Sequence, residues 1–564
     1  MMLTIRHKMT GLLLFGIGMG LFCTQENPVT PQSTQSDTVV HNADITRSET
    51  WASDKVHRIS SPVTVKNATL RIDPGAAIVF DPGVSLSILD SAGLVADGSQ
   101  KSISFSSAAK KKGDWGCIYF AENSLDDSCA LVNCTIEYGG GDTALSAMIY
   151  CDGAAPAISG CTLRNSASNG VVLNGDCRPI EFHSNTIADN DAAPVASFAV
   201  NVSFIGSNQY SNNAIAALQI TDGTITENSI WYPHDLPFLF TAELDISSAQ
   251  LILNSGIELK FDGDVGVTIS EGGSLHADGV FAPIIFTGEY VGGWNGIFLT
   301  RTANSGACTF NNCLIECGGR NSRYPANVVL EYSSPTIANC IVQKSLGYGI
   351  FIDGDFMPVL FSNNQVTENR RAPFSISAND VANVPYGDYA GNGEDVIEVR
   401  GTPSAQPMTR DGYWQYLGMP YKIIDTIQIL SCTLTLAPGT TLLMTERSGF
   451  EILAQGGLIA EGVSSNIAIQ AIRPVVGLWA AIYFSPLANA QSCRLVHCDI
   501  SYGGGDSSLP GMIVCDHISP TIQYCRIEYS QTWGIYMRGN ETITDLQSNM
   551  FNNNGFGDSY VAPN

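Results

Sequence analysis

Three glycine-rich loops, one in each third of the chain, carry acidic side chains that could bind a cation. The first loop reads E-Y-G-G-G-D, with Glu137 and Asp142 at its ends; the second begins at Glu316, and the third contains Asp506. Carboxylate oxygens are ligands that Ca²⁺ prefers. These four residues are therefore candidate Ca²⁺ ligands, and no other metal or cofactor is expected. The alternative is that the glycines serve only to permit a sharp turn.

Aromatic and basic residues form a second candidate site, for sugar rings. Tyr348 and Trp533 occupy equivalent positions, where the first third of the chain has Asn169. An exposed aromatic ladder there could stack on a sugar ring. The middle third also adds Arg320 and Arg323 close to its glycine-rich loop. A residue that recurs in every third usually serves packing, so these departures from the pattern are the better candidates for ligand contact.

The cysteines could form disulfides or a buried ladder of thiols. Cys134 and Cys161 are close enough in the predicted fold for a bond, but stacked, parallel Cβ vectors rarely allow the dihedral angle that a disulfide needs. We therefore expect reduced, buried thiols. Neither C-x2-C pairs nor Cys/His clusters at zinc spacing occur. Nine of the 16 cysteines recur at matching positions: Cys129, Cys308 and Cys493; Cys134, Cys313 and Cys498; Cys161, Cys340 and Cys525.

The elements that must position these residues repeat along the chain. Trp115, Trp294 and Trp479 recur at a nearly constant spacing, and a second column with the same spacing contains Trp51, Trp231 and Trp414. Such spacing indicates a triplicated unit of about 180 residues. We expect three repeats, the third shorter at its C-terminal end: 51–230, 231–413 and 414–564.

A shorter period of about 24 residues lies inside each repeat. The tripeptide Cys134-Thr-Ile returns at Cys161 and at Asn185, and both other repeats keep these two intervals. This step suits one turn of a β-solenoid with three short strands. Cys and Asn at the head of the tripeptide would then stack as a ladder, about 4.8 Å apart. The alternative, a β-sandwich repeated three times, has no natural place for this short period.

The run W-G-C-I-Y-F … N-C-T-I-E-Y-G-G-G … A-P-A-I-S-G-C-T-L resembles the right-handed parallel β-helix repeat proteins of bacteria, over roughly residues 51–564. The resemblance implies an all-β, right-handed parallel β-helix. It implies little about activity, because this superfamily includes pectin lyases, polygalacturonases and adhesins.

The enzymes of this superfamily supply motifs to look for. Polygalacturonase-like members carry clustered aspartates and a His-Gly pair, whereas this chain has no His-Gly dipeptide and a single Asp-Asp pair, Asp126-Asp127. Lyase-like members hold Ca²⁺ with carboxylates and abstract a proton with an arginine. If the chain is an enzyme, the expected place is therefore a groove beside Arg320 and Arg323.

The N-terminal sequence predicts an export signal. Residues 1–22 have a basic start followed by an apolar stretch too short to span a bilayer comfortably. Cys23 follows and is expected to be the lipidated N-terminus of a lipoprotein. Phe22 departs from the small residue usual at that position, so cleavage after Gly20 to give a secreted protein is the alternative. Residues 23–50 are expected to be a flexible polar tether, which places the protein at the outer membrane or cell surface, held by its lipid alone.

Charge and repetition together favour a binding or spacing role. The net charge is −25 with only 14% charged residues, and no basic face interleaved with aromatics exists to bind nucleic acid. Repetition without an asymmetric catalytic cluster predicts a non-catalytic cell-surface spacer or adhesin. Its expected partner is a polysaccharide or another surface protein. The alternative is a divergent polysaccharide lyase or glycoside hydrolase.

Overall fold

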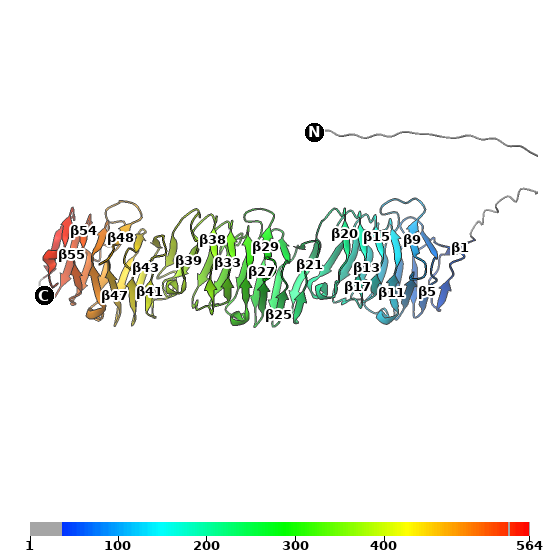
Figure 1. The fold of residues 1–564 in the computed structure, drawn as a ribbon, viewed down its shortest axis with the longest axis horizontal. Coiled ribbons are helices and arrows are strands. Elements are labelled where there is room, and N and C mark those ends of the chain that lie inside the picture. Colours follow the sequence, from blue (N-terminus) through cyan, green and yellow to red (C-terminus); the bar gives the residue numbers. More distant parts are fainter. Residues whose placement is uncertain (1–36, 540–541, 563–564) are drawn as a thin grey trace, which may run out of the picture.

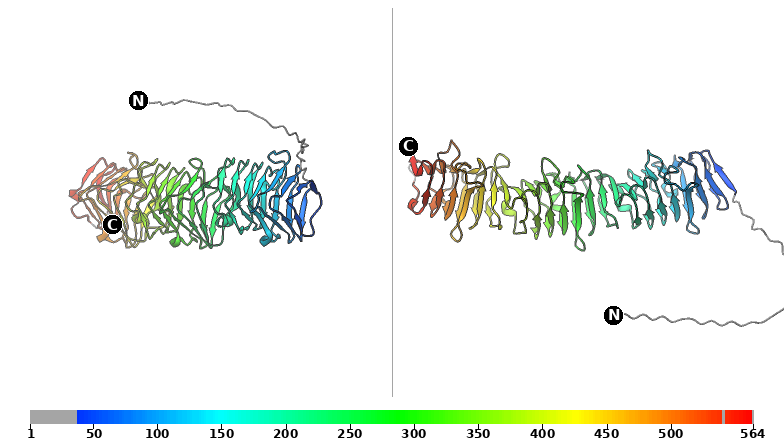
Figure 2. Two further views of the ribbon diagram at one scale, coloured as in Figure 1. Left: turned by 45° about the vertical axis from the view of Figure 1, so that its right-hand side comes forward. Right: turned by 90° about the horizontal axis from the view of Figure 1, so that it is seen from above.

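The protein is an all-β parallel solenoid of about 21 turns, which forms one long rod (Figure 1). This computed structural model describes residues 37–539 and 542–562. The expected export signal at 1–22 and the lipidation site Cys23 lie outside the described residues. Figure 2 shows from two further directions that the turns follow one another along a single axis, with the described N- and C-terminal turns at opposite ends.

Equivalent strands of successive turns pair in register. On one face β9 (Ile103–Ser107), β12 (Cys134–Glu137), β15 (Thr162–Arg164) and β18 (Thr186–Ala188) lie side by side. The register joins Thr135 to Thr162 and Thr162 to Thr186, all in parallel. The intervals between the repeated tripeptides are thus single turns of the coil. Because sandwich sheets are mainly antiparallel, this pairing contradicts the sandwich alternative.

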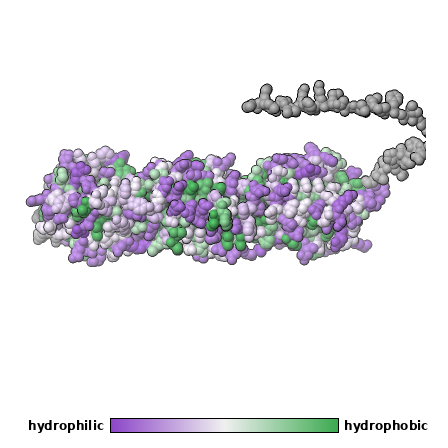
Figure 3. All heavy atoms as spheres, in the orientation of Figure 1, coloured by the Kyte–Doolittle hydropathy of each residue, from purple (hydrophilic) through white to green (hydrophobic). Residues whose placement is uncertain are grey.

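One main hydrophobic core runs through the rod, and a small second cluster around Val329 and Tyr348 lies apart from it. The strands are short and alternate between buried and partly exposed side chains, as β4 (Val63–Lys66) and β24 (Leu244–Ser247) show. One continuous cluster of buried side chains extends from Ile45 to Ile543. The hydrophilic residues remain outside, as Figure 3 shows, with hydrophobic patches gathered mainly near the middle of this face. The predicted packing role of six tryptophans is confirmed, since each is at most 2% exposed: Trp51, Trp115, Trp231, Trp294, Trp414 and Trp479.

The predicted ladder of cysteine and asparagine is present. The backbone N–H of Cys134 donates to Cys161 Sγ at 3.4 Å, and the N–H of Cys161 donates to Asn185 Oδ1 at 2.9 Å. The amide of Asn185 returns a hydrogen bond to the carbonyl of Ile158 at 2.9 Å. The same bond from cysteine N–H to asparagine recurs twice, from Cys340 to Asn364 at 3.0 Å and from Cys525 to Asn549 at 2.9 Å. Cysteine and asparagine exchange in one column because both accept this N–H.

The cysteines of the described residues are free thiols, and all except Cys317 are buried. Contact with Cys161 and burial raise the pKa of the Cys134 thiol. Burial likewise raises the pKa of Cys308 to about 11. A thiol reacts as its thiolate, so these side chains act as compact hydrophobic groups.

The solenoid begins earlier than expected. Strands β1 (Thr38–His41) and β2 (Glu49–Trp51) pair with β3 (Val56–Ile59) and β5 (Thr69–Ile72), so the expected tether over 23–50 is wrong for its C-terminal part. The first strand is almost entirely exposed, from Thr38 to Val40, so its sequence lacks the alternation of buried residues seen in later turns. Within the described residues, no helix has the length and apolar character needed to cross a membrane.

Replacing Asn364 with alanine should destabilise the rod. The side chain is 2% exposed and bonds both Cys340 N–H and the Ile337 carbonyl, and leaving such groups buried without partners costs about 1–3 kcal/mol. We expect a lower thermal midpoint, measured by circular dichroism. Asn466→Ala is the control, because Asn466 bonds only at the exposed surface. Equal midpoints for the two variants would contradict the ladder's structural role.

Alkylation should distinguish the thiols. Among the described cysteines, native protein should react with iodoacetamide first at Cys317, the one that is partly exposed. Mass spectrometry of peptides, compared with urea-unfolded protein, provides the measurement. Cys317→Ser should remove the fast site, and rapid labelling of Cys134 or Cys161 in native protein would count against the buried ladder.

Candidate functional site

The glycine-rich loops follow strand ends, and their carboxylates already have protein partners. Glu137, the last residue of β12, accepts hydrogen bonds from Ser106 Oγ at 3.1 Å and pairs with Arg164 at 2.8 Å. Asp142 accepts the N–H of Ala144 at 2.9 Å within its own turn. Glu316, at the end of β32 (Cys313–Glu316), accepts from Gln343 Nε2 at 2.7 Å. These carboxylates are used for structure.

The glycines in these loops make room for tryptophan. A Cβ on Gly139 would lie 2.7 Å from the ring of Trp115, and one on Gly503 would lie 2.5 Å from Trp479. The indole N–H of Trp115 in turn donates to the Glu137 carbonyl at 2.9 Å. Across the described residues, no group of three or more His, Cys, Asp or Glu side chains is placed to hold a metal ion. The Ca²⁺ hypothesis for these loops therefore gains no support.

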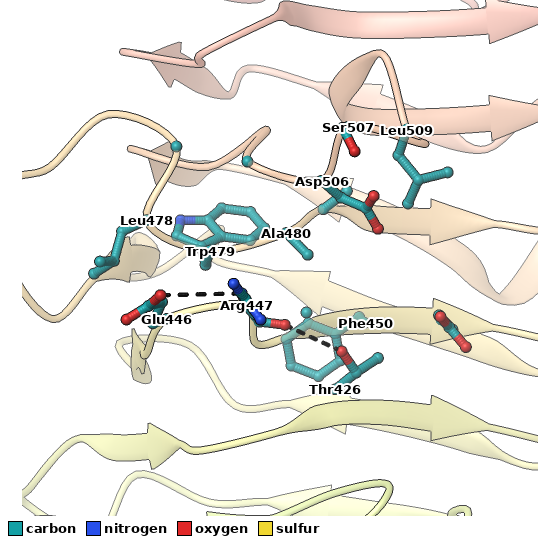
Figure 4. A pocket seen from close by; sticks show the side chains of 15 residues that line it. Thr426, Glu446, Arg447, Phe450, Leu478, Trp479, Ala480, Asp506, Ser507 and Leu509 are labelled. Atoms are coloured by element: carbon teal, nitrogen blue, oxygen red, sulfur yellow. Dashed lines mark hydrogen bonds and ion pairs between the residues drawn. The ribbon is translucent and has the colours of Figure 1, made fainter.

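Asp506 differs from the other acidic candidates because it lines a pocket. The pocket has a volume of about 490 Å³ and lies where successive turns meet near Glu446, Arg447 and Glu451. Figure 4 shows Asp506 on one side of this pocket and Arg447 on another. Asp506 accepts hydrogen bonds from the N–H and Oγ of Ser508, at 2.8 and 2.7 Å. The carboxylate is thus held by its own loop, whereas the exposed Arg447, 4.0 Å from Glu446, can still meet a polar ligand.

The structure separates the two arginines predicted to contact sugar. Arg320 pairs with Asp264 and donates to Tyr290 Oη at 3.3 Å. The guanidinium of Arg323 instead lies over the ring of Tyr324, 5.0 Å from its centre. The two side chains therefore contact different partners, and their contact with sugar stays a prediction.

The expectation of an exposed ladder is wrong for Tyr348. Its side chain is only 6% exposed, and its hydroxyl donates to Glu398 at 2.5 Å and accepts from Arg371 at 3.1 Å. Sequence could not show this network, because its members are up to 50 residues apart. Trp533 is half-buried and stacks on Tyr560 with ring centres 5.0 Å apart. Its contact with sugar stays a prediction.

Three aromatic rows that the sequence reading missed lie on outward-facing positions of stacked strands. Tyr119 on β10 (Ile118–Ala121) is in register with Tyr150 on β13 (Ala147–Asp152), and their ring centres are 6.0 Å apart. These rings are half-buried, whereas the neighbouring Ile118 and Phe120 are 0% exposed. The signal was available in the motif I-Y-F, because alternate residues of a strand face opposite sides.

Equivalent rows occur twice more. In the second, Phe298 on β30 (Ile297–Leu299) and Phe351 on β36 (Tyr348–Asp353) flank Val329 in register, and Tyr324 packs against both rings. The third row runs through β49 (Ile482–Phe484), β52 (Gly511–Asp516), β55 (Trp533–Arg538) and β57 (Gly557–Ala562). It contains Tyr483, Tyr536 and Tyr560; Val514 lies between the first two in register, and the last two rings stack at 5.6 Å.

A carboxylate accompanies each row. Tyr119 Oη donates to Asp152 at 3.0 Å, and Tyr483 Oη donates to Asp516 at 2.8 Å. Burial, and then the hydrogen bond to the carboxylate, raises the pKa of each tyrosine to about 12. In the second row Asp353 pairs with Arg400 at 3.1 Å. An apolar ring beside a fixed acceptor suits a sugar, which presents C–H groups on its face and hydroxyls on its edge.

Comparison with known proteins gives no assignment: no family model matches the chain, and no curated protein or solved structure is significantly similar to it. The functional argument therefore depends on the geometry of these rows and pockets.

Calcium should have no effect on the stability of the rod. Because Glu137 and Glu316 are already paired with protein groups, we expect the same thermal midpoint in EGTA and in excess Ca²⁺, with Mg²⁺ as the control for ionic strength. A midpoint raised by Ca²⁺ alone, and no longer raised in Asp142→Ala or Asp506→Ala, would restore the metal hypothesis.

Proposed function

We propose that this protein is a non-catalytic, exported cell-surface spacer that binds polysaccharide along one side of the rod. The observation that supports this most directly is the set of three outward aromatic rows, each beside a carboxylate. Most of their rings are half-buried and so held in position, whereas Tyr560 is exposed, and the rows face away from the core. A rigid rod with repeated, partly exposed rings provides several contacts to one long, regular polymer.

The rows lie far enough apart for multivalent binding. Seven strand steps separate Tyr119 from Phe298, which corresponds to about 34 Å along the rod at about 4.8 Å per step. A single polymer chain that contacts several rows gains affinity without any new contact, because the second contact is intramolecular. Weak stacking at each row is then sufficient.

The proposal includes the handedness of the coil, its division into repeats and its cellular location. We infer a right-handed coil, since connections between parallel strands of one sheet are right-handed in about 98% of cases. We also infer three repeats at 51–230, 231–413 and 414–564; protruding loops beside β9, β29 (Ile284–Gly288) and β48 (Ile467–Ala471) in Figure 1 agree with this division. Lipidation at Cys23 and an outer-membrane or cell-surface location complete the proposal; their support is the N-terminal sequence.

A polysaccharide lyase or glycoside hydrolase, in a groove beside Arg320 and Arg323, is the alternative. Near the second row, Tyr348 and Lys422 are two further titratable groups, and both contact Glu398. Burial and Glu398 raise the pKa of Tyr348 to about 12. Although burial favours the neutral amine, Glu394 and Glu398 raise the pKa of Lys422. A general acid or base works best with a pKa near the working pH. Neither group meets this condition, so neither is favoured as a general acid or base.

Removing the rows should weaken binding to polysaccharide. The triple variant Tyr150→Ala, Phe298→Ala, Tyr536→Ala takes one ring from each row. For any polymer of a polysaccharide panel that the native protein binds, we expect the apparent affinity to fall about 100-fold or more, as loss of multivalency predicts. Affinity gel electrophoresis provides the measurement.

The matched control replaces three exposed aromatics elsewhere, Tyr232, Phe281 and Tyr413, with alanine, and should bind as the native protein does. Equal losses in both variants, or no binding to any polymer, would overturn the proposal. Unsaturated products or new reducing ends in the same incubations would establish the enzyme alternative.

A further inference from the structure

A second binding feature lies beneath the segment 401–411, which joins β40 (Ile397–Arg400) to β41 (Gly412–Trp414). This segment covers a pocket of about 470 Å³, within the range of small-molecule sites. The floor comes from the end of β36, which contributes Asp353, and from the turns after β36 and β39 (Phe374–Ser377), which contribute Asp355 and Asp380. The roof is formed by residues 403–407.

An insertion creates the roof. Leu218 and Ile397 pair equivalently with the next turn, but the path from Ile397 to Trp414 is longer than the path from Leu218 to Trp231. The longer segment is held at both ends and stands away from the rod between them. The pocket beneath it is the insertion pocket.

Hydrogen bonds hold both ends of the insertion. The N–H of Thr402 donates to the Thr426 carbonyl at 2.8 Å, and the N–H of Met408 donates to the Gln428 carbonyl at 2.8 Å. Met408 is 1% exposed, and Asn379 Nδ2 donates to the Pro407 carbonyl at 3.0 Å. The pocket is therefore formed before any ligand arrives, which lowers the entropic cost of binding.

The floor contains charged groups that are buried and fixed. Asp380 is 0% exposed and accepts from Phe356 N–H at 2.9 Å, while Arg410 pairs with it at 2.6 Å. Arg400, 6% exposed, orients Asp353, and its Nε has no hydrogen-bond partner among the described residues. An unpartnered buried donor such as Arg400 Nε is costly. The guanidinium groups of Arg400 and Arg410 hold Asp353 and Asp380 in place, so these carboxylates differ from those of a solvated acidic surface.

The two sides of the pocket differ in charge. Carboxylates line the floor, whereas the roof has no charged residue and combines Pro403, Ala405 and Pro407 with the polar Ser404 and Gln406. Tyr332 stands at the rim, 42% exposed, with the guanidinium of Arg301 4.9 Å from the centre of its ring. A pyranose suits both sides, because its hydroxyls donate to carboxylates and its C–H groups contact the proline and alanine side chains. The carboxylates of Asp353, Asp355 and Asp380 disfavour an anionic sugar, since Arg400 and Arg410 already pair with them and Arg301 at the rim pairs with Glu331.

We propose that the insertion pocket binds one neutral pyranose unit. This deepens the proposed function and rests on it: the aromatic rows hold the polymer along the rod, and the insertion pocket selects a neutral residue of the chain or a branch.

The test uses full-length protein and a panel of free neutral saccharides: glucose, galactose, mannose, N-acetylglucosamine and their disaccharides. Saturation-transfer NMR gives the affinity. We expect at least one to bind, and Ala405→Trp, which fills the pocket, to weaken that binding about tenfold or more. Asp355→Ala should weaken it too. Asp176→Ala is the matched control, because Asp176 occupies the equivalent turn of the first repeat and is also exposed and paired with an arginine; it should bind as the native protein does.

The outcomes separate this inference from the proposed function. The triple variant of the aromatic rows should lose polymer binding and keep saccharide binding, which supports both. Polymer binding that depends on the rows, with no saccharide bound or with binding unchanged in Ala405→Trp, overturns the insertion pocket alone. Preference for glucosamine or glucuronate over every neutral sugar also overturns it. Unchanged thermal midpoints confirm that the variants are folded.

Discussion

Every feature of this molecule depends on the hydrogen bonding of parallel strands from one turn to the next. Each turn satisfies its backbone groups with the turns before and after it, as Thr135, Thr162 and Thr186 illustrate. Equivalent residues are thereby placed about 4.8 Å apart. A side chain that suits one turn must also suit its neighbours, so the coil selects columns of similar residues. Unlike a globular core, the interior is one long stack.

Inside the coil, that stacking raises a problem for polar groups at the corners, where the chain leaves one strand and begins the next. The ladder of cysteine and asparagine solves it, because Cys161 and Asn185 each accept a backbone N–H from the preceding turn. A second solution is steric. The glycines after the acidic strand ends leave space for the rings of Trp115 and Trp479. The cysteines that first suggested disulfides, and the glycines beside the candidate Ca²⁺ ligands, therefore serve the winding of the chain.

Outside the coil, the same stacking turns single aromatic residues into rows. Tyr119 and Tyr150 lie beside one another although a full turn of the chain separates them in sequence. Packing against neighbours and a hydrogen bond to Asp152 restrict the ring of Tyr119. Such rings lose little conformational entropy when a ligand binds. The middle of the rod departs from this pattern in two places, the network of Tyr348 and Glu398 and the insertion at 401–411. The insertion is the place where the rod can select one kind of sugar.

The sequence by itself determined the solenoid, because its short period, its alternation of buried residues and its columns of tryptophan, cysteine and asparagine are properties of local spacing. It also located the departures from the pattern, at Arg320, Arg323, Tyr348 and Trp533. Only the tertiary structure decided what those departures contact. Tyr348 is buried because Glu398 and Arg371, far away in sequence, surround it. Arg320 reaches Asp264 in another loop, whereas Arg323 lies over the adjacent Tyr324. Contacts between turns depend on how loops of unequal length lie on the surface, and residue spacing alone cannot predict how they lie.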